Sequence, residues 1–191
     1  MKRSSTVAFT LAMLAVLAVL TAGCGYNTIQ TMDERVNQAQ GQIEAQLQRR
    51  ADLIPNLVNT VKGVTKQEDT VFISIANARS RLGGAIQSGN VREMAAADSA
   101  LSQGLGRLIA ISENYPELRS SENFKQLQDQ LEGTENRIAV ARQDYNAAVG
   151  EYNAYIRRFP YNLTAKMFGL GEPRDYFEAE AGATEAPKVQ F

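Results

Sequence analysis

The sequence predicts an all-α protein, arranged as an antiparallel up-and-down four-helix bundle with two long outer helices and a flexible C-terminal tail. No alternating pattern of apolar and polar residues, as a β-strand would show, extends beyond a few residues. Apolar residues instead recur at steps of three and four, which places them on one face of a helix. Most proline and glycine residues lie between these stretches, and such short connections favour antiparallel neighbours.

The N-terminus is typical of a bacterial lipoprotein precursor. Two basic residues precede an apolar run from Val7 to Leu20. A helix of that length covers about 21 Å, less than the roughly 30 Å of a bilayer core, so the run predicts the apolar region of a signal peptide. The next residues, Leu20-Thr-Ala-Gly-Cys24, resemble a lipobox that has Thr21 where leucine is usual.

Cys24 is therefore predicted to be acylated and to become the first residue of the mature chain. Multiple acyl chains make a firm anchor, since each buried methylene contributes roughly 0.8 kcal/mol. Two alternatives remain: ordinary secretion with a free Cys24 thiol, or an uncleaved anchor extended by Ala22 and Gly23. Gly25 after the cysteine, in place of aspartate, predicts the outer membrane, facing the periplasm, in a bacterium with two membranes. The predicted parts are a signal peptide (1–23), a lipid-anchor linker (24–28), a helical bundle (29–170) and a flexible tail (171–191).

The first long helix is predicted to begin after an Asn27 cap, with Gln30 three residues further on. Pro55 lies inside the helical pattern, and we expect a kink near residues 50–52 because the proline ring clashes with the carbonyl one turn earlier. The apolar stripe of this helix consists of Ile29, Met32, Val36, Ala39, Ile43, Leu47, Ile54, Leu57, Val61 and Val64.

Two shorter helices are predicted in the middle of the chain. The capping-box pattern of residues 65–68 precedes the first of them, and Asn90 is expected to cap the second. Gly104 and Gly106 lower helix propensity by up to about 1 kcal/mol each relative to alanine. They either permit close helix approach or are weak points of the helix. Pro116 is expected to mark the break that follows.

The second long helix is predicted to start at Ser120 or Ser121 and to stop before Pro160. A short helix is predicted over 163–170, and the small, acidic residues after it predict the flexible tail. The apolar stripe of the long helix follows a heptad pattern of steps of three and four. Its members are Phe124, Leu127, Leu131, Thr134, Ile138, Ala141, Tyr145, Ala148, Tyr152, Tyr155 and Phe159.

Composition excludes several classes of function. A formal net charge of −1 over 191 residues argues against a nucleic-acid-binding protein with a large basic face. The absence of histidine removes the commonest general base, the catalytic triads and histidine-containing metal sites. The carboxylates Glu132, Glu135, Asp144 and Glu151 are interpreted as a solvated face, because a di-metal bundle site needs Glu-x-x-His. We expect no enzyme activity, no cofactor, no metal and no small-molecule substrate.

Polar residues surround the predicted kink: Arg49, Arg50, Asp52 and Asn56, beside Pro55. They could form a binding spot on a bent helix. Alternatively, polar side chains satisfy the carbonyl that Pro55 frees, or pair with the last long helix. We favour the structural interpretation.

Tyrosine and asparagine recur together in the last long helix, at Tyr145-Asn146 and Tyr152-Asn153, with Tyr155 nearby. Such pairs could form a carbohydrate platform, because tyrosine offers both an apolar face and a hydroxyl. Core packing with satisfied hydroxyls is the favoured interpretation.

The end of the last long helix is predicted to lie close to the membrane. In an up-and-down bundle it would end beside the start of the first helix, and only four residues separate Cys24 from Ile29. Basic and aromatic side chains suit the headgroup zone. The candidate membrane-facing residues are Arg157, Arg158, Phe159, Tyr161, Lys166, Met167 and Phe168.

Three segments carry a family resemblance: residues 48–63 with Arg50-Ala-Asp-Leu-Ile-Pro-Asn56, the segment Ala76-Asn-Ala-Arg79, and residues 141–153 followed by Arg158-Phe-Pro160. In this order they resemble the LemA family of bacterial membrane-associated proteins. Residues 187–191 also resemble the usual C-terminal ending of that family. The resemblance implies an antiparallel helical bundle outside the cytoplasm and no established catalytic activity. Many members begin with a membrane-spanning helix, where this chain has a lipobox.

The expected function is a non-enzymatic scaffold of the cell envelope, anchored to the membrane through its N-terminal lipid. It would recruit or stabilise a membrane or envelope protein. The resemblance implies TPM-domain membrane proteins as one partner class, since family members are often encoded near them. The alternative is a binding module for peptidoglycan or another envelope glycan.

Overall fold

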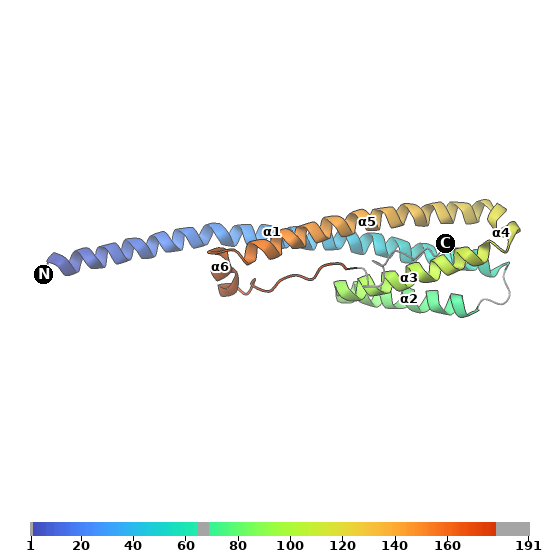
Figure 1. Ribbon diagram of the computed structural model, residues 1–191, viewed down its shortest axis with the longest axis horizontal. Coiled ribbons are helices and arrows are strands. Elements are labelled where there is room, and N and C mark those ends of the chain that lie inside the picture. The colour runs from blue at the N-terminus through green and yellow to red at the C-terminus, as the bar shows by residue number, and fades with distance from the viewer. Residues whose placement is uncertain (1, 65–68, 179–191) are drawn as a thin grey trace, which may run out of the picture. The chain divides into compact units, whose positions relative to one another are not determined.

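The computed structural model describes residues 2–64 and 69–178, and between residues 2 and 24 it describes the side chains of Leu11 and Met13 only. Within these ranges every regular element is helical, which confirms the all-α fold class. The elements are α1 (Lys2–Lys62), α2 (Asp69–Ser88), α3 (Val91–Ser112), α4 (Pro116–Ser120), α5 (Glu122–Ile156) and α6 (Tyr161–Met167) (Figure 1). The four-helix antiparallel arrangement stays a prediction.

The chain divides into two compact units, and both long helices contribute to each. The first unit combines Met1–Ala39 with Ala147–Arg174, which brings the N-terminal part of α1 together with the end of α5 and with α6. α1 contributes aliphatic residues to the core of this unit, and α5 and α6 contribute aliphatic and aromatic ones. The buried hydrophobic residues are Ile29, Val36, Ala39, Val149, Tyr152, Ile156 and Ala165.

α1 is helical without interruption from Lys2 onward, so the prediction that a helix begins at Asn27 is wrong. The backbone carbonyl of Asn27 accepts a hydrogen bond from the Thr31 hydroxyl at 2.9 Å, inside the helix. The physical reason is composition, because the preceding segment is rich in alanine and leucine, which have high helix propensity.

The second unit combines Gln40–Asn146 with Asp175–Phe191. Here α2 packs along α3, and both contribute apolar residues to its core (Figure 1). The predicted cap of α3 is confirmed, because the Asn90 side chain accepts a hydrogen bond from the Glu93 backbone amide at 3.2 Å. Pro116 begins α4, as expected for a residue that lacks an amide hydrogen. The predicted capping box at 65–68 lies outside the described residues.

The buried stripe of α5 follows most of the predicted heptad as far as Tyr145 and keeps Tyr152, but beyond Tyr145 its other two members lie one residue later than predicted. Val149 and Ile156 are buried, whereas Tyr155 is half-buried and Phe159 is exposed. A straight helix has 3.6 residues per turn, so a strict repeat of 3.5 drifts off the buried face over several turns. The end of the predicted stripe therefore lies on the surface of the protein.

Candidate functional surfaces

A buried arginine joins three helices of the second unit. Arg50 of α1 is almost fully buried, and its Nη1 lies 2.7 Å from a carboxylate oxygen of Asp98 in α3. The same nitrogen lies 2.8 Å from Glu135 of α5, and Nη2 donates to the Ser102 hydroxyl at 2.9 Å. Because a buried charge needs partners, this cluster fixes the three helices against one another.

Asp98 and Ser102 are the members of this cluster that the sequence did not predict, and Asp98 is the charged one. Burial raises the pKa of its carboxyl, and the nearby Glu135 adds to that, while Arg50 lowers it. The signal was its position: Asp98 lies four residues after Met94 and three before Leu101, both buried. An aspartate on that buried face indicates a carboxyl with a polar or charged partner in the core. Glu135 was assigned to a solvated face, but it is only half-exposed and paired with Arg50.

Pro55 leaves one carbonyl of α1 without its usual helical partner. Proline has no amide hydrogen, so the carbonyl of residue i−4, here Ala51, cannot accept the normal bond. Arg79 of α2 donates its Nε hydrogen to this oxygen at 2.7 Å. A polar side chain therefore satisfies the freed carbonyl, but it comes from the Ala76–Arg79 segment of α2. It is not one of the residues around the proline to which the structural interpretation assigned this role.

The other residues near Pro55 do not assemble into one site. Arg49, Asp52 and Asn56 are exposed, and Asp52 accepts a hydrogen bond from Gln48 of the same helix at 2.9 Å. Arg50 alone turns inward. The five residues that the sequence places together are thus divided between the core and the surface.

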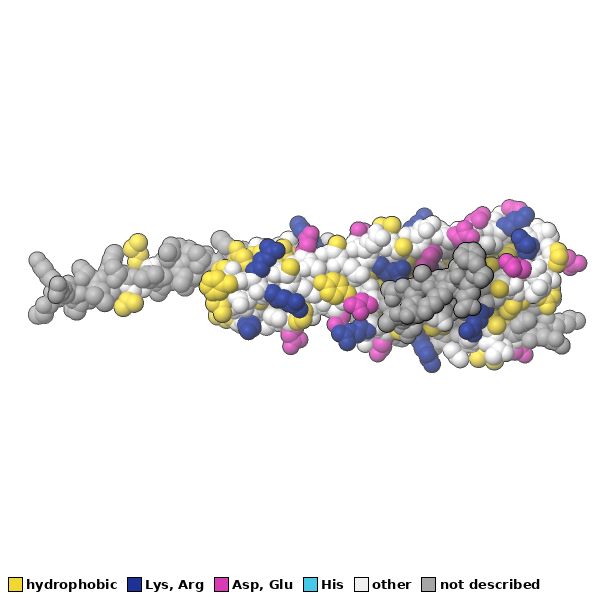
Figure 2. Space-filling view, in the orientation of Figure 1, with side chains coloured by type: hydrophobic (Ala, Val, Ile, Leu, Met, Phe, Trp, Pro, Cys, Tyr) yellow, Lys and Arg dark blue, Asp and Glu magenta, His cyan; other side chains and the backbone are white. Residues whose placement is uncertain are grey.

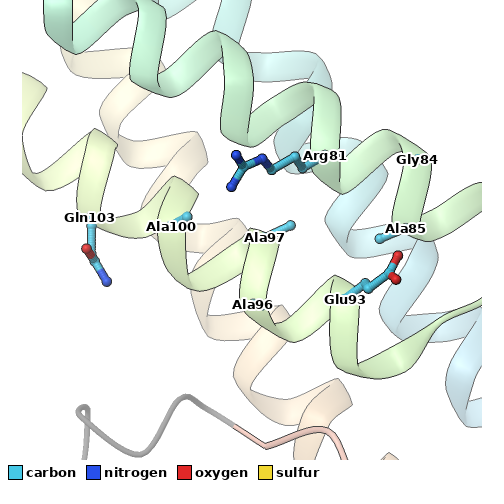
Figure 3. A pocket seen from close by; sticks show the side chains of 8 residues that line it. All are labelled: Arg81, Gly84, Ala85, Glu93, Ala96, Ala97, Ala100 and Gln103. Atoms are coloured by element: carbon cyan, nitrogen blue, oxygen red, sulfur yellow. The ribbon is translucent and has the colours of Figure 1, made fainter.

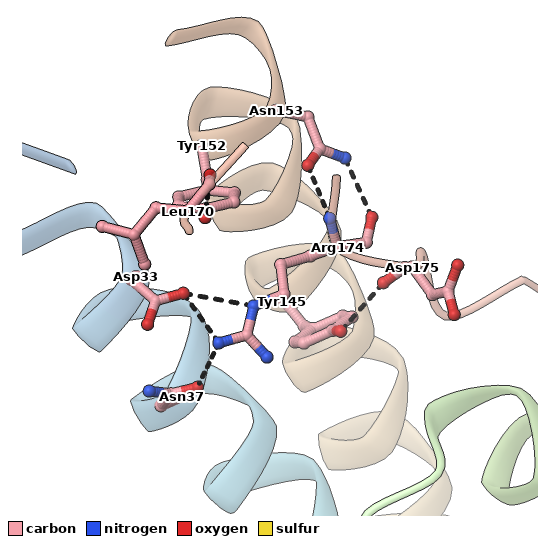
Figure 4. A network of polar contacts seen from close by, with 8 residues as sticks. All are labelled: Asp33, Asn37, Tyr145, Tyr152, Asn153, Leu170, Arg174 and Asp175. Carbon is pink, nitrogen blue, oxygen red and sulfur yellow. Dashed lines mark hydrogen bonds and ion pairs between the residues drawn. The ribbon is translucent and has the colours of Figure 1, made fainter. Parts of the chain in front are cut away.

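In the first unit, tyrosine and asparagine side chains of α5 hold the chain after α6 (Figure 4). The Tyr152 hydroxyl donates to the carbonyl of Leu170 at 2.9 Å. Asn153 pairs with the backbone of Arg174 twice, accepting from its amide at 2.8 Å and donating to its carbonyl at 2.9 Å. The Arg174 guanidinium in turn lies 2.7 Å from Asp33 of α1. Burial, together with Asp33, raises the pKa of Tyr152, which keeps its hydroxyl a donor.

The second unit uses the other tyrosine–asparagine pair in the same way. The Tyr145 hydroxyl donates to the carbonyl of Asp175 at 2.9 Å. Asn146 accepts from the Phe177 amide at 2.8 Å and donates to its carbonyl at 3.1 Å. The Phe177 ring is buried, and the Arg142 guanidinium lies 5.8 Å from its centre. The interpretation of both tyrosines as packed residues with satisfied hydroxyls is confirmed.

Residues 171–178, the first part of the predicted flexible tail, form no helix, but three of them are held by α5. The backbone groups of Arg174, Asp175 and Phe177 bond to side chains of that helix. The physical reason is that amide side chains replace the missing secondary-structure partners. Residues 179–191 lie outside the described part of the chain.

The candidate membrane-facing residues lie at one end of the first unit, around α6. Tyr161 packs on Gly25 of α1 so closely that a methyl group added to this glycine would lie 2.7 Å from the ring. Phe168 lies against Tyr26, with ring centres 4.5 Å apart, and Tyr161 stacks on Tyr155 at 4.4 Å. Arg157, Arg158, Phe159, Lys166, Met167 and Phe168 are all exposed. The side chain of Cys24 is outside the described residues.

A groove of about 490 Å³ lies between α2 and α3 (Figure 3). Its floor is made of small side chains, with charged groups at the edges, and it offers no nucleophile with a base partner. Within the part of the chain that the structure describes, no helix is both long and apolar enough to cross a bilayer, and no three potential metal ligands gather. The groove is lined by Arg81, Gly84, Ala85, Glu93, Ala96, Ala97, Ala100 and Gln103.

Comparison with known proteins gives the family context. A sequence model of the LemA family matches residues 39–191. Two magnetosome proteins of Paramagnetospirillum magneticum, MamQ 1 and MamQ 2, are each 29% identical over 198 aligned positions, covering 91% of this chain and 73% of theirs. The magnetosome protein MamQ of Magnetospirillum gryphiswaldense is 28% identical, covering 83% of this chain and 67% of its own.

Proposed function

The chain belongs to the LemA family, and on this premise we propose that it is a lipid-anchored, non-catalytic scaffold of the bacterial cell envelope. It would hold a membrane or envelope protein near the bilayer, with TPM-domain proteins as one class of partner. The observation that carries the proposal is the position of Cys24, the only cysteine in the sequence. It follows the apolar run after three small residues, and it directly precedes Gly25, which packs in the first unit.

The polar chemistry of the described residues supports a non-catalytic role. Arg50 and Asp98 neutralise each other in the core, and Arg79 satisfies a backbone carbonyl. Tyr152 and Asn153 bond to the backbone of the same chain. These groups maintain the fold, and among the described residues none of them lines the groove between α2 and α3, which itself brings no nucleophile together with a base. A scaffold needs a stable surface and an anchor, and it needs no such constellation.

Lipidation is tested by changing residues at the predicted processing site. We expect Cys24→Ala to lose acyl-chain incorporation and to leave the membrane fraction. The matched change Thr21→Leu restores the usual lipobox residue and should raise the fraction of mature, lipid-bearing chain. Globomycin, which blocks lipoprotein signal peptidase, should cause the precursor of the unaltered chain to accumulate. Unchanged attachment and mobility of Cys24→Ala would defeat the lipid anchor.

The scaffold role is tested by proximity labelling in the native envelope. A labelling enzyme fused to the C-terminus should mark a reproducible set of membrane or envelope proteins. The same fusion carrying Cys24→Ala should lose that set, because it lacks the anchor that places it there. An identical set from both chains would contradict recruitment at the membrane. Saturable binding of the purified protein to isolated cell wall would instead support a glycan-binding module.

A further inference from the structure

The end of the first unit exposes an unusual amount of apolar surface within a few residues. The exposed fractions are 80% for Phe159, 59% for Leu163, 70% for Met167 and 52% for Phe168. Figure 2 shows hydrophobic side chains gathered at one end of the described surface, with Lys and Arg side chains next to them. Single exposed apolar residues are normal on a protein, whereas a contiguous patch indicates an interaction surface. We call this patch, formed by Phe159, Leu163, Met167 and Phe168, the apex patch.

Every charged side chain of residues 152–171, which include the apex patch, is basic. Residues 152–171 contain Arg157, Arg158 and Lys166 and no acidic residue, although the whole chain has a formal net charge of −1. Gly25 and Tyr26 of α1, which pack against this end, carry no charge. All three basic side chains are exposed. The local charge is therefore complementary to an anionic surface.

The apex patch is held in a fixed relation to the start of the predicted mature chain. The Tyr161 ring lies on Gly25, one residue after Cys24, and the Phe168 ring lies on Tyr26. The stacked pair of Tyr155 and Tyr161 ties the end of α5 to the first residue of α6. Any anchor at Cys24, whether lipid or apolar helix, brings this end of the unit to the bilayer surface.

We propose that the apex patch inserts into the headgroup zone of an anionic bilayer, with Arg157, Arg158 and Lys166 contacting lipid phosphates. Aromatic and basic side chains suit this zone, because their apolar parts are buried while their polar ends stay hydrated. The inference rests on the proposed function, namely attachment of the N-terminus to the membrane. It deepens that proposal by assigning a second lipid contact, which orients the first unit on the membrane.

The test places a fluorescent probe at two positions of equal exposure in the full chain. Leu163→Cys in the apex patch and Ile73→Cys in α2 are each 59% exposed in the unaltered protein. Each variant is purified from membranes, labelled with an environment-sensitive dye and reconstituted into phosphatidylcholine vesicles with or without phosphatidylglycerol. The unaltered chain gives the background labelling of Cys24. Quenching by lipids brominated near the headgroup reports contact with the bilayer.

We expect blue-shifted emission at position 163 and quenching several-fold stronger than at position 73, in particular with phosphatidylglycerol. Arg157→Glu and Arg158→Glu should each lower the quenching at position 163 in anionic vesicles, by about fivefold for each positive charge removed. The matched change Arg137→Glu, at an exposed position of α5, should have no effect.

The possible results distinguish the apex contact from the lipid anchor. Equal, weak quenching at both positions in a vesicle-bound chain overturns the apex contact and leaves the anchor intact. A chain that does not sediment with vesicles overturns both. Disulfide-linked dimers through position 163 without lipid quenching assign the patch to a second copy of the chain. Ready dye labelling of Cys24 in the denatured, unaltered chain defeats the lipid anchor alone.

Discussion

Two glycines of α3, two residues apart, have opposite roles. A methyl group at Gly104 would lie 2.9 Å from Cγ1 of Ile75 in α2, whereas at Gly106 it would meet nothing within 4 Å. Gly104 is therefore required for the close approach of α2 and α3, and Gly106 only weakens the helix. The sequence left both interpretations open for each glycine, because residue type does not show which face of a helix meets a neighbour.

This difference predicts opposite changes in stability. Gly106→Ala should raise the free energy of unfolding by up to about 1 kcal/mol through helix propensity. Gly104→Ala gains the same propensity, but Ile75 must shift to admit the methyl group, and overpacking costs about 1–3 kcal/mol. We expect Gly104→Ala to be neutral to destabilising. Urea unfolding of both variants measures the difference, and equal stabilisation by both would contradict the close-approach role.

Asp98 gives the second unit a pH dependence of its own. Because burial raises the pKa of Asp98 above its ordinary value of 3.8, the folded chain binds this proton more readily than the unfolded chain does. The contribution of Asp98 to stability is therefore greatest below pH 3.8 and is lost as the pH rises through the higher, folded pKa. Asn cannot titrate, so the Asp98→Asn variant should not show this loss of stability with rising pH.

The measurement is the free energy of unfolding of both chains from about pH 3.5 upward. The difference, unaltered chain minus variant, should fall as the pH rises above 3.8 and then level off. Subtraction is needed because the exposed carboxylates titrate in the same range. A difference that rises with pH would mean that Arg50 outweighs burial at this site.

At the scale of the elements, α1 and α2 are coupled through the carbonyl that Pro55 frees. Arg79→Leu should cost about 1–2 kcal/mol, because the Ala51 oxygen loses its donor. In a Pro55→Ala background the helix supplies its own amide donor to that oxygen, so the same Arg79 change should cost much less. Arg81→Leu, an exposed change in the same helix, serves as the control. A double-mutant cycle with no coupling energy would refute the link.

The segment after α6 offers a test at the same scale. Asn153→Leu removes both hydrogen bonds to the Arg174 backbone, each worth about 1 kcal/mol. Trypsin should then cleave after Arg174 about 10- to 30-fold faster, since cleavage requires a released segment. Asn136→Leu, at an exposed position of α5, should leave the rate unchanged. Mass spectrometry of timed digests follows the cut, and unfolding curves confirm that the variants remain folded.

The sequence predicts the helices well and this segment poorly, for a physical reason. Apolar stripes record which helix faces are buried, so residues such as Val36, Leu47 and Ile138 are correctly placed. Asn146 and Asn153 bind backbone groups of the segment after α6. Because every residue except proline offers the same amide and carbonyl, the sequence of that segment does not indicate that it is bound. The partners Asp98 and Arg79 were missed because their roles depend on which helices meet, and periodicity within one helix does not encode that.

At the scale of the whole molecule, the two units share the helices α1 and α5, and each also contains part of the segment after α6. Only the first unit contains Gly25, which adjoins the predicted anchor, and the candidate membrane-facing residues around α6. Attachment at Cys24 would therefore place the first unit at the bilayer.

The mature N-terminus decides between the three interpretations of the apolar run. Acylation predicts that the membrane-bound chain begins at Cys24 and is heavier than residues 24–191 by the mass of its acyl groups. Ordinary secretion predicts a cut within the small residues near Ala22 and no added mass, and an uncleaved anchor predicts a chain that still carries Lys2 and Arg3. We expect the first result, measured by intact-mass spectrometry of the detergent-extracted chain. Lipase treatment should lower the mass of an acylated chain, because it removes ester-linked acyl groups. A mass that lipase leaves unchanged would exclude the lipobox interpretation, even if the chain begins at Cys24.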